Sequence, residues 1–222
     1  MTDGTVPLSQ LVDWLRRFAA LVTEQRAYLT ELDSAIGDAD HGANMARGMT
    51  AVMEKVDGAA APTAADELFK SVGMTLVTSV GGASGPLYGT FFLRMGMNAG
   101  PIAEFDGPQL GAALRAGLDG VVARGKAELG DKTMFDAMAP ALDAYDSTIA
   151  AGDPTSDAAA AAFAAAETGR DATIPLVARK GRASYLGERS AGHLDPGATS
   201  TTYLFQALSE ALAGGAPPTP KG

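Results

Sequence analysis

Residues 8–24 read LSQLVDWLRRFAALVTE, and large apolar side chains recur in this stretch every three or four positions. This spacing places them on one face of an α-helix, with Arg16, Arg17 and Glu24 on other faces. No segment alternates convincingly like a strand, and 173–177 is the best short candidate. The chain is therefore predicted to be all-α, with about eight helices and short connections, which favours an antiparallel bundle or barrel. The seven further helical segments are 42–56, 64–79, 86–98, 108–124, 132–150, 156–178 (with a break near Gly169) and 198–213.

Composition bounds the organisation of the chain. Its 222 residues suit one large domain or two small ones, and its formal charge is -9. With no repeat and no clear boundary, we expect a single domain over 1–213 and a disordered Pro- and Gly-rich tail over 214–222. An acidic chain of this kind is a poor nucleic-acid binder, because affinity for a polyanion comes from clustered Lys and Arg. Neither a signal peptide nor a membrane span is found, so we expect a cytoplasmic protein without membrane association.

The stretch 32–44 reads LDSAIGDADHGAN and brings three carboxylates, Asp33, Asp38 and Asp40, onto one glycine-punctuated loop. Close carboxylates repel one another, so some would protonate unless a cation sits among them. Hard oxygen ligands on a short loop suit Mg²⁺, which completes its octahedral shell with waters and substrate phosphates. A polar turn that caps nearby backbone groups is the ordinary alternative. With His41 and Asn44 also in the run, the cluster favours a metal site.

Two further loops are candidates for binding an anion. The first, 80–89 (VGGASGPLYG), enters a predicted helix through glycines, and the free N–H groups of a helix amino terminus favour phosphate. Taken alone this signal is weak, because Gly-Gly before a helix is more often just a tight turn. The second, 179–197 (RKGRASYLGERSAGHLDPG), is long and gathers positive charge, and Asp195 and Pro196 suit the start of the next helix. A solvated surface loop is the alternative for this segment.

The stretch 120–127 (GVVARGKA) fits G-x-x-x-x-G-K but has Ala127 where a hydroxyl should hold Mg²⁺, and it ends a helical pattern. A Walker-type NTPase is therefore rejected. Gly125 and the turn 130–134 (GDKTM) can instead line a pocket, with Met134 as an apolar wall for a purine or simply as a core residue. Neither histidine, His41 or His193, has the Ser or Cys partner that would suggest a hydrolase.

Taken together, these loops resemble the nucleotide-binding L subunit (DhaL) family of dihydroxyacetone kinases. The similarity runs over nearly the whole chain, and its most specific stretches are IGDADHG at 36–42, GGASGPL at 81–87, RGKAE at 124–128 with GDKTM at 130–134, and 180–200. Four separated motifs occur in the family's order. The resemblance implies an eight-helix antiparallel up-and-down barrel, with a nucleotide site formed by loops at one end.

The resemblance also implies roles for individual residues. Asp33, Asp38 and Asp40 would bind two Mg²⁺ ions that clamp the phosphates of ADP or ATP. No residue of this chain is assigned as catalytic. The residues implied to contact the nucleotide are His41, Gly42, Ala43, Asn44, Ala83, Ser84, Gly125, Met134, Arg182, Asp195, Pro196 and Gly197.

The activity implied is that of a phosphotransferase acting on dihydroxyacetone, which a separate K subunit holds. Because the chain is not fused to a K domain, it resembles the phosphotransferase-system type, in which a phosphohistidine M subunit recharges bound ADP. An ATP-dependent kinase subunit for another ketose and a non-catalytic nucleotide-binding regulatory module remain alternatives. A homodimer is compatible with the sequence, although no feature specifies it.

Overall fold

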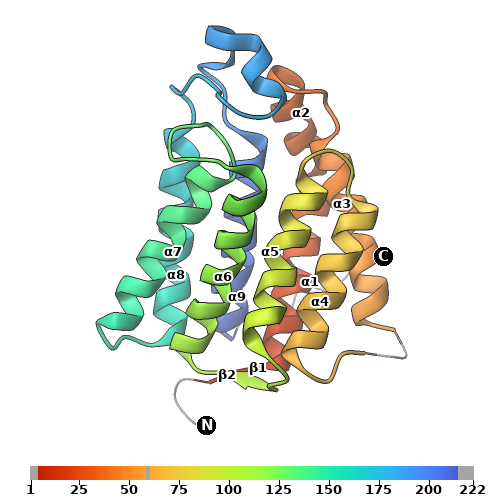
Figure 1. Cartoon of the computed structure of the whole chain (residues 1–222), viewed down its shortest axis with the longest axis vertical. Coiled ribbons are helices and arrows are strands. Elements are labelled where there is room, and N and C mark those ends of the chain that lie inside the picture. The colour runs from red at the N-terminus through yellow and green to blue at the C-terminus, as the bar shows by residue number, and fades with distance from the viewer. Residues whose placement is uncertain (1–4, 59–60, 215–222) are drawn as a thin grey trace.

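The computed structural model describes residues 5–58 and 61–214, and helices dominate this part of the chain (Figure 1). Two-residue strands, β1 (Val6–Pro7) and β2 (Glu104–Phe105), pair antiparallel, with Val6 opposite Phe105. The helices within the described residues are α1 (Leu8–Glu24), α2 (Arg26–Ile36), α3 (His41–Val56), α4 (Ala65–Ser79), α5 (Ser84–Ala99), α6 (Gly107–Gly125), α7 (Phe135–Ala150), α8 (Thr155–Ala172), the 3₁₀-helix η1 (Arg182–Ser190) and α9 (Pro196–Leu212).

Eight of these helices close into an antiparallel up-and-down barrel. Each helix from α3 to α9 packs against the next one along the chain, and α1 packs against both α3 and α9, which closes the ring. Short connections favour this order, because consecutive helices then become antiparallel neighbours. The predicted all-α fold is confirmed.

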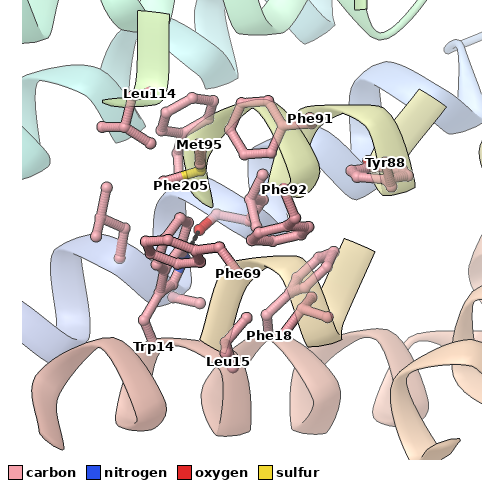
Figure 2. Packing of buried hydrophobic residues seen from close by; sticks show 14 of the residues in the cluster. Trp14, Leu15, Phe18, Phe69, Tyr88, Phe91, Phe92, Met95, Leu114 and Phe205 are labelled. Atoms are coloured by element: carbon pink, nitrogen blue, oxygen red, sulfur yellow. Dashed lines mark hydrogen bonds between the residues drawn. The ribbon is translucent and has the colours of Figure 1, made fainter. Parts of the chain in front are cut away.

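Aromatic side chains fill the centre of the barrel (Figure 2). Trp14 packs against Phe69 and Phe92 with ring centroids 6.2 and 5.8 Å away, and all three rings are fully buried. The Trp14 indole N–H donates to the Leu204 carbonyl oxygen at 2.8 Å, so its polar atom is satisfied inside the core. Burying each such side chain stabilises the fold by roughly 1.5 to 3 kcal/mol. The helical face predicted over 8–24 is the face that packs here.

The structure differs from the sequence prediction at α2 and at the end of α8, and one predicted segment is not tested. Helix α2 was not predicted, and it lies across one end of the barrel, beyond the ring (Figure 1). The segment predicted as helical to 178 ends at Ala172, and 173–177 forms a turn and an irregular stretch instead of a strand. The tail predicted from 214 lies outside the described residues from 215 on.

Alternation of helix direction gathers every second connection at the same end of the barrel, the upper end in Figure 1. These four connections are 37–40, 80–83, 126–134 and 173–195. Helices α3, α5, α7 and α9 all begin at this end, so their unpaired N–H groups and positive dipole ends gather there. No helix of the described residues is both long and apolar enough to cross a membrane.

Candidate cation and anion site

Three carboxylates lie close together at the end of the barrel that carries these four connections. Asp33, Asp38 and Asp40 each offer an oxygen, and these oxygens lie within 4.8 Å of one another. Asp38 and Asp40 lie on the 37–40 connection as predicted, whereas Asp33 lies in the last turn of α2 instead of on a loop. Asp33 Oδ2 accepts from the backbone N–H groups of Asp40 at 2.8 Å and His41 at 3.0 Å. The carboxylate thereby fixes the connection and the first N–H group of α3.

The backbone of this connection is shaped to bring the carboxylates together. A Cβ atom on Gly37 would lie 2.0 Å from Asp33 Oδ1, so only glycine allows this approach. Ala39 has a φ of 63°, in the left-handed region that costs an L-residue roughly 1 to 2 kcal/mol. Strain of this kind concentrates at functional sites.

The donor set fits a small divalent cation. At a metal–oxygen distance of about 2.1 Å, two ligands on opposite sides of Mg²⁺ lie about 4.2 Å apart, and the three oxygens lie within 4.8 Å of one another. The Arg182 guanidinium donates from Nε to Asp38 Oδ2 at 2.9 Å, and both side chains reach solvent. Arg182 therefore neutralises part of the cluster from its outer side. From the sequence, Arg182 was assigned to the site only through the family resemblance.

A cavity of about 880 Å³ opens beside the carboxylates and is lined by all four connections. This volume lies in the range of cavities that hold nucleotide-sized ligands. The implied site residues that line it are Asp33, Asp38, Asp40, His41, Ala83, Ser84, Gly125, Met134, Arg182, Asp195, Pro196 and Gly197.

Three residues implied to contact the nucleotide do not line the cavity: Gly42, Ala43 and Asn44. Gly42 packs against α2, since a Cβ atom there would lie 2.1 Å from the Arg26 carbonyl oxygen. Asn44 Oδ1 accepts from Arg47 Nη2 at 2.7 Å. Gly42 therefore allows α3 to pack closely on α2, and the Asn44 side chain is engaged within α3.

Several cavity-lining residues were not singled out from the sequence. Lys132 and Thr133 belong to the quoted GDKTM turn, and Arg179, Lys180 and Tyr185 belong to the long loop. The sequence indicated that these residues belong to a glycine-rich turn or a positively charged loop. It did not indicate which of their side chains point into the cavity.

His41 is a buried polar group of the site. Its ring Nδ1 lies 3.0 Å from Ser84 Oγ and its Nε2 lies 2.9 Å from Ser200 Oγ. Burial lowers the pKa of His41 to about 4, against the opposing charges of Asp33 and Asp40. The ring is therefore neutral at pH 7. The sequence-based expectation that His41 has no serine partner was wrong, because both serines are distant along the chain.

One wall of the cavity is apolar. Met134 is buried, and Leu87, Val121 and Gly125 line the same space. A Cβ atom on Gly125 would lie 3.3 Å from Leu87 Cδ2, and one on Gly197 would lie 3.4 Å from the Met134 nitrogen. Small residues at these points let the end of α6 approach Leu87 of α5, and let the start of α9 approach the 126–134 connection.

Lys132 ties two connections together. Its ammonium group donates to the carbonyl oxygens of Thr173, Ile174 and His193, and its side chain is almost fully buried. Burial lowers the pKa of Lys132, although the charge of Asp195 opposes this. The left-handed backbone of Lys132 (φ 62°) turns the side chain toward these carbonyl groups.

Asp195 begins α9 as its N-cap. Its Oδ2 accepts from the Ala198 N–H at 2.7 Å, as the sequence predicted for this position. Burial raises the pKa of Asp195 to about 7, with a further rise from Asp136 and an opposing effect from Lys132. The cap is therefore made by a carboxyl group that titrates near neutral pH.

These features define an all-α barrel with a cavity and a carboxylate cluster at one end. Residues 35–210 match the model of the DAK2 domain. The chain belongs to the DAK2 domain family.

Full-length relatives resemble the chain over most of their length. It is 46% identical over 205 residues to the ADP-binding subunit DhaL of the PEP-dependent dihydroxyacetone kinase of Escherichia coli K12, covering 90% of this chain and 95% of that protein. It is 45% identical to the ADP-binding subunit DhaL of the PTS-dependent dihydroxyacetone kinase of Lactococcus lactis, covering 91% and 96%. A crystal structure of the C. freundii dihydroxyacetone kinase with AMP-PNP and Mg²⁺ is similar with a TM-score of 0.68 and 28% identity, over 89% of this chain and 33% of that one.

Proposed function

We propose that this chain is the ADP- and ATP-binding subunit of a cytoplasmic dihydroxyacetone kinase, and that it transfers a phosphoryl group to dihydroxyacetone on a separate K subunit. The observation that carries the proposal is the group of three carboxylates beside a nucleotide-sized cavity. The near full-length similarity to subunits named for binding ADP supports it.

Asp33, Asp38 and Asp40 would hold two Mg²⁺ ions. Bound there, the ions would supply positive charge to phosphate oxygens, which is the main requirement of phosphoryl transfer. The chain needs this charge, because its own formal charge is -9. Asp33 is held by two backbone N–H groups, so it is oriented before any ligand arrives.

The nucleotide would lie along the cavity from the carboxylates to the apolar wall. At the phosphate end, the implied contacts are His41 to Asn44 at the start of α3 and Ala83 and Ser84 at the start of α5, and the positive dipole ends of both helices would favour phosphate there. At the other end, Gly125 and Met134 would enclose the base. Arg182 and the turn at Asp195, Pro196 and Gly197 would cover it and exclude water.

The proposed partners would meet the chain at the mouth of the cavity. The carboxylates and the exposed Arg182 lie at the open side of the cavity, where a K subunit would bring the ketose. Bound ADP would be recharged in place by a phosphohistidine M subunit. The names of the PEP-dependent and PTS-dependent relatives support this donor over free ATP.

Nucleotide binding tests the metal site directly. Purified protein should carry ADP or ATP with Mg²⁺, detected by mass spectrometry, and Asp38→Ala should lose both. Asp153→Ala is the matched control, because Asp153 is exposed on the connection between α7 and α8 at the opposite end. A wild-type protein that neither carries nucleotide nor binds added Mg·ADP in calorimetry contradicts the proposal.

Reconstitution separates the donors and the alternatives. The chain with a K subunit and a phosphorylated M subunit should convert dihydroxyacetone to its phosphate, whereas the chain with K and ATP should not turn over at a comparable rate. Turnover with ATP alone would identify an ATP-dependent kinase subunit. Nucleotide binding without turnover under either condition would identify a regulatory module.

A further inference from the structure

Three hydroxyl groups form a hydrogen-bonded chain that ends at His41. Ser200 and Thr201 lie in the first turns of α9, and Tyr88 lies in α5; all three side chains are fully buried. Tyr88 Oη lies 2.7 Å from Ser200 Oγ and 3.0 Å from Thr201 Oγ1. Ser200 Oγ also lies 2.9 Å from His41 Nε2 and 3.1 Å from the Gly197 carbonyl oxygen.

The number of protons decides the direction of these hydrogen bonds. The Gly197 carbonyl oxygen can only accept, so its bond takes the single hydroxyl proton of Ser200. Ser200 must then accept from Tyr88, and Tyr88 in turn must accept from Thr201.

With its own proton engaged, Ser200 can only accept from the His41 ring, so Nε2 of His41 must carry a proton. This holds whatever the charge of the ring. The nitrogen left facing Ser84 is Nδ1.

We infer that Ser200, supported by Tyr88 and Thr201, is a positioning residue that fixes Nε2 as the protonated nitrogen of His41 and directs Nδ1 toward the Ser84 hydroxyl. Ser84 is the first residue of α5 and lines the cavity beside the carboxylates. The buried hydroxyl chain thus sets the hydrogen-bonding direction of a side chain at the phosphate end of the site. The effect of this chain on nucleotide binding rests on the proposed function. The position of the proton on the His41 ring does not.

Nitrogen NMR can observe the predicted tautomer directly. The chain has two histidines, so His193→Gln leaves His41 as the only ring to assign. In this ¹⁵N-labelled variant at pH 8 without nucleotide, long-range ¹H–¹⁵N spectra should show a protonated Nε2 and an unprotonated Nδ1. The opposite pattern, with the proton on Nδ1, would overturn the inference.

Removing the acceptor tests the role of Ser200. Ser200→Ala should release the ring into a mixture of tautomers and weaken Mg·ADP binding by about five- to tenfold. Thr202→Ala is the matched control: this buried hydroxyl donates to Ala198 and does not touch His41, so its spectrum should match the wild type. Ser200→Thr, which keeps the hydroxyl, should restore the tautomer.

An unchanged tautomer in Ser200→Ala would refute the positioning role. If Ser200→Ala does not fold, the His193→Gln spectrum still decides the direction of the bonds. Absence of nucleotide binding in the wild type, together with the expected spectrum, would contradict the proposed function and leave the ring assignment standing.

Discussion

At the scale of single residues, Asp195 serves two requirements that conflict. As an N-cap it accepts a backbone N–H group, which favours the charged carboxylate. As a buried group close to Asp136 it is disfavoured in that form, and burial is the larger effect, so its pKa rises to about 7. A capping aspartate is readable from the Asp-Pro-Gly sequence, but its altered pKa is not, because it depends on side chains that only folding brings near.

Asp195 should make stability depend on pH between about 4 and 7. A carboxyl group whose pKa is higher in the folded state binds more protons when folded, so its contribution to stability decreases as pH rises from the ordinary Asp pKa of 3.8 to about 7. Asp195→Asn keeps a capping oxygen without the charge. From pH 5 to pH 8, urea unfolding should show the variant gaining roughly 1 to 3 kcal/mol relative to the wild type. A constant difference between the two proteins would contradict the altered pKa.

At the scale of elements, the site depends on how connections are tied to one another. Helix α2 escaped prediction because it is short and only Leu29, Asp33 and Ile36 are buried, too few to give a clear apolar period. The predicted helix over 132–150 begins later, at Phe135, because the preceding turn is shaped by Asp136, which accepts from the N–H groups of Gly130 and Thr133. Local patterns locate the middle of helices better than their ends.

The contribution of the Lys132 hydrogen bonds to stability can be measured. Lys132→Met should destabilise the protein by about 2 to 4 kcal/mol, because it leaves buried carbonyl groups at Thr173, Ile174 and His193 without a donor. It should also speed hydrogen exchange across 173–195. Lys126→Met is the control: Lys126 also has a left-handed backbone but caps α6 at the exposed surface, so its change should stay within about 0.5 kcal/mol. Equal losses of stability in the two variants would exclude a specific role of Lys132 in holding the two connections together.

At the scale of the whole molecule, closing the ring of helices is what assembles the site. Contacts of α1 with α3 and α9 bring the first and last thirds of the chain together. The same closure aligns four helix starts at one end, which no single motif could provide. The opposite end, where β1 meets β2, carries none of the implied site residues within the described part of the chain.

Ligand binding should therefore stabilise the barrel as one unit. A nucleotide at 100 times its dissociation constant adds about 2.7 kcal/mol to the free energy of unfolding when the unfolded chain does not bind it. Mg·ADP should give this shift, and adding EDTA should abolish most of it. Hydrogen exchange should slow at 37–40, 80–83, 126–134 and 173–195 and stay unchanged at 151–154. Equal protection at both ends would argue against a site at one end.

The sequence by itself determined the eight helices of the barrel and the chemistry of the connections, because apolar spacing and short Asp- and Gly-containing motifs act locally. It also brought Asp38 and Asp40 together, since they are neighbours on one turn. Only the tertiary structure decided the partners of His41, which lie 43 and 159 positions away at Ser84 and Ser200. Such contacts depend on which helices pack side by side and how they are rotated, and this is set by the filling of the whole core.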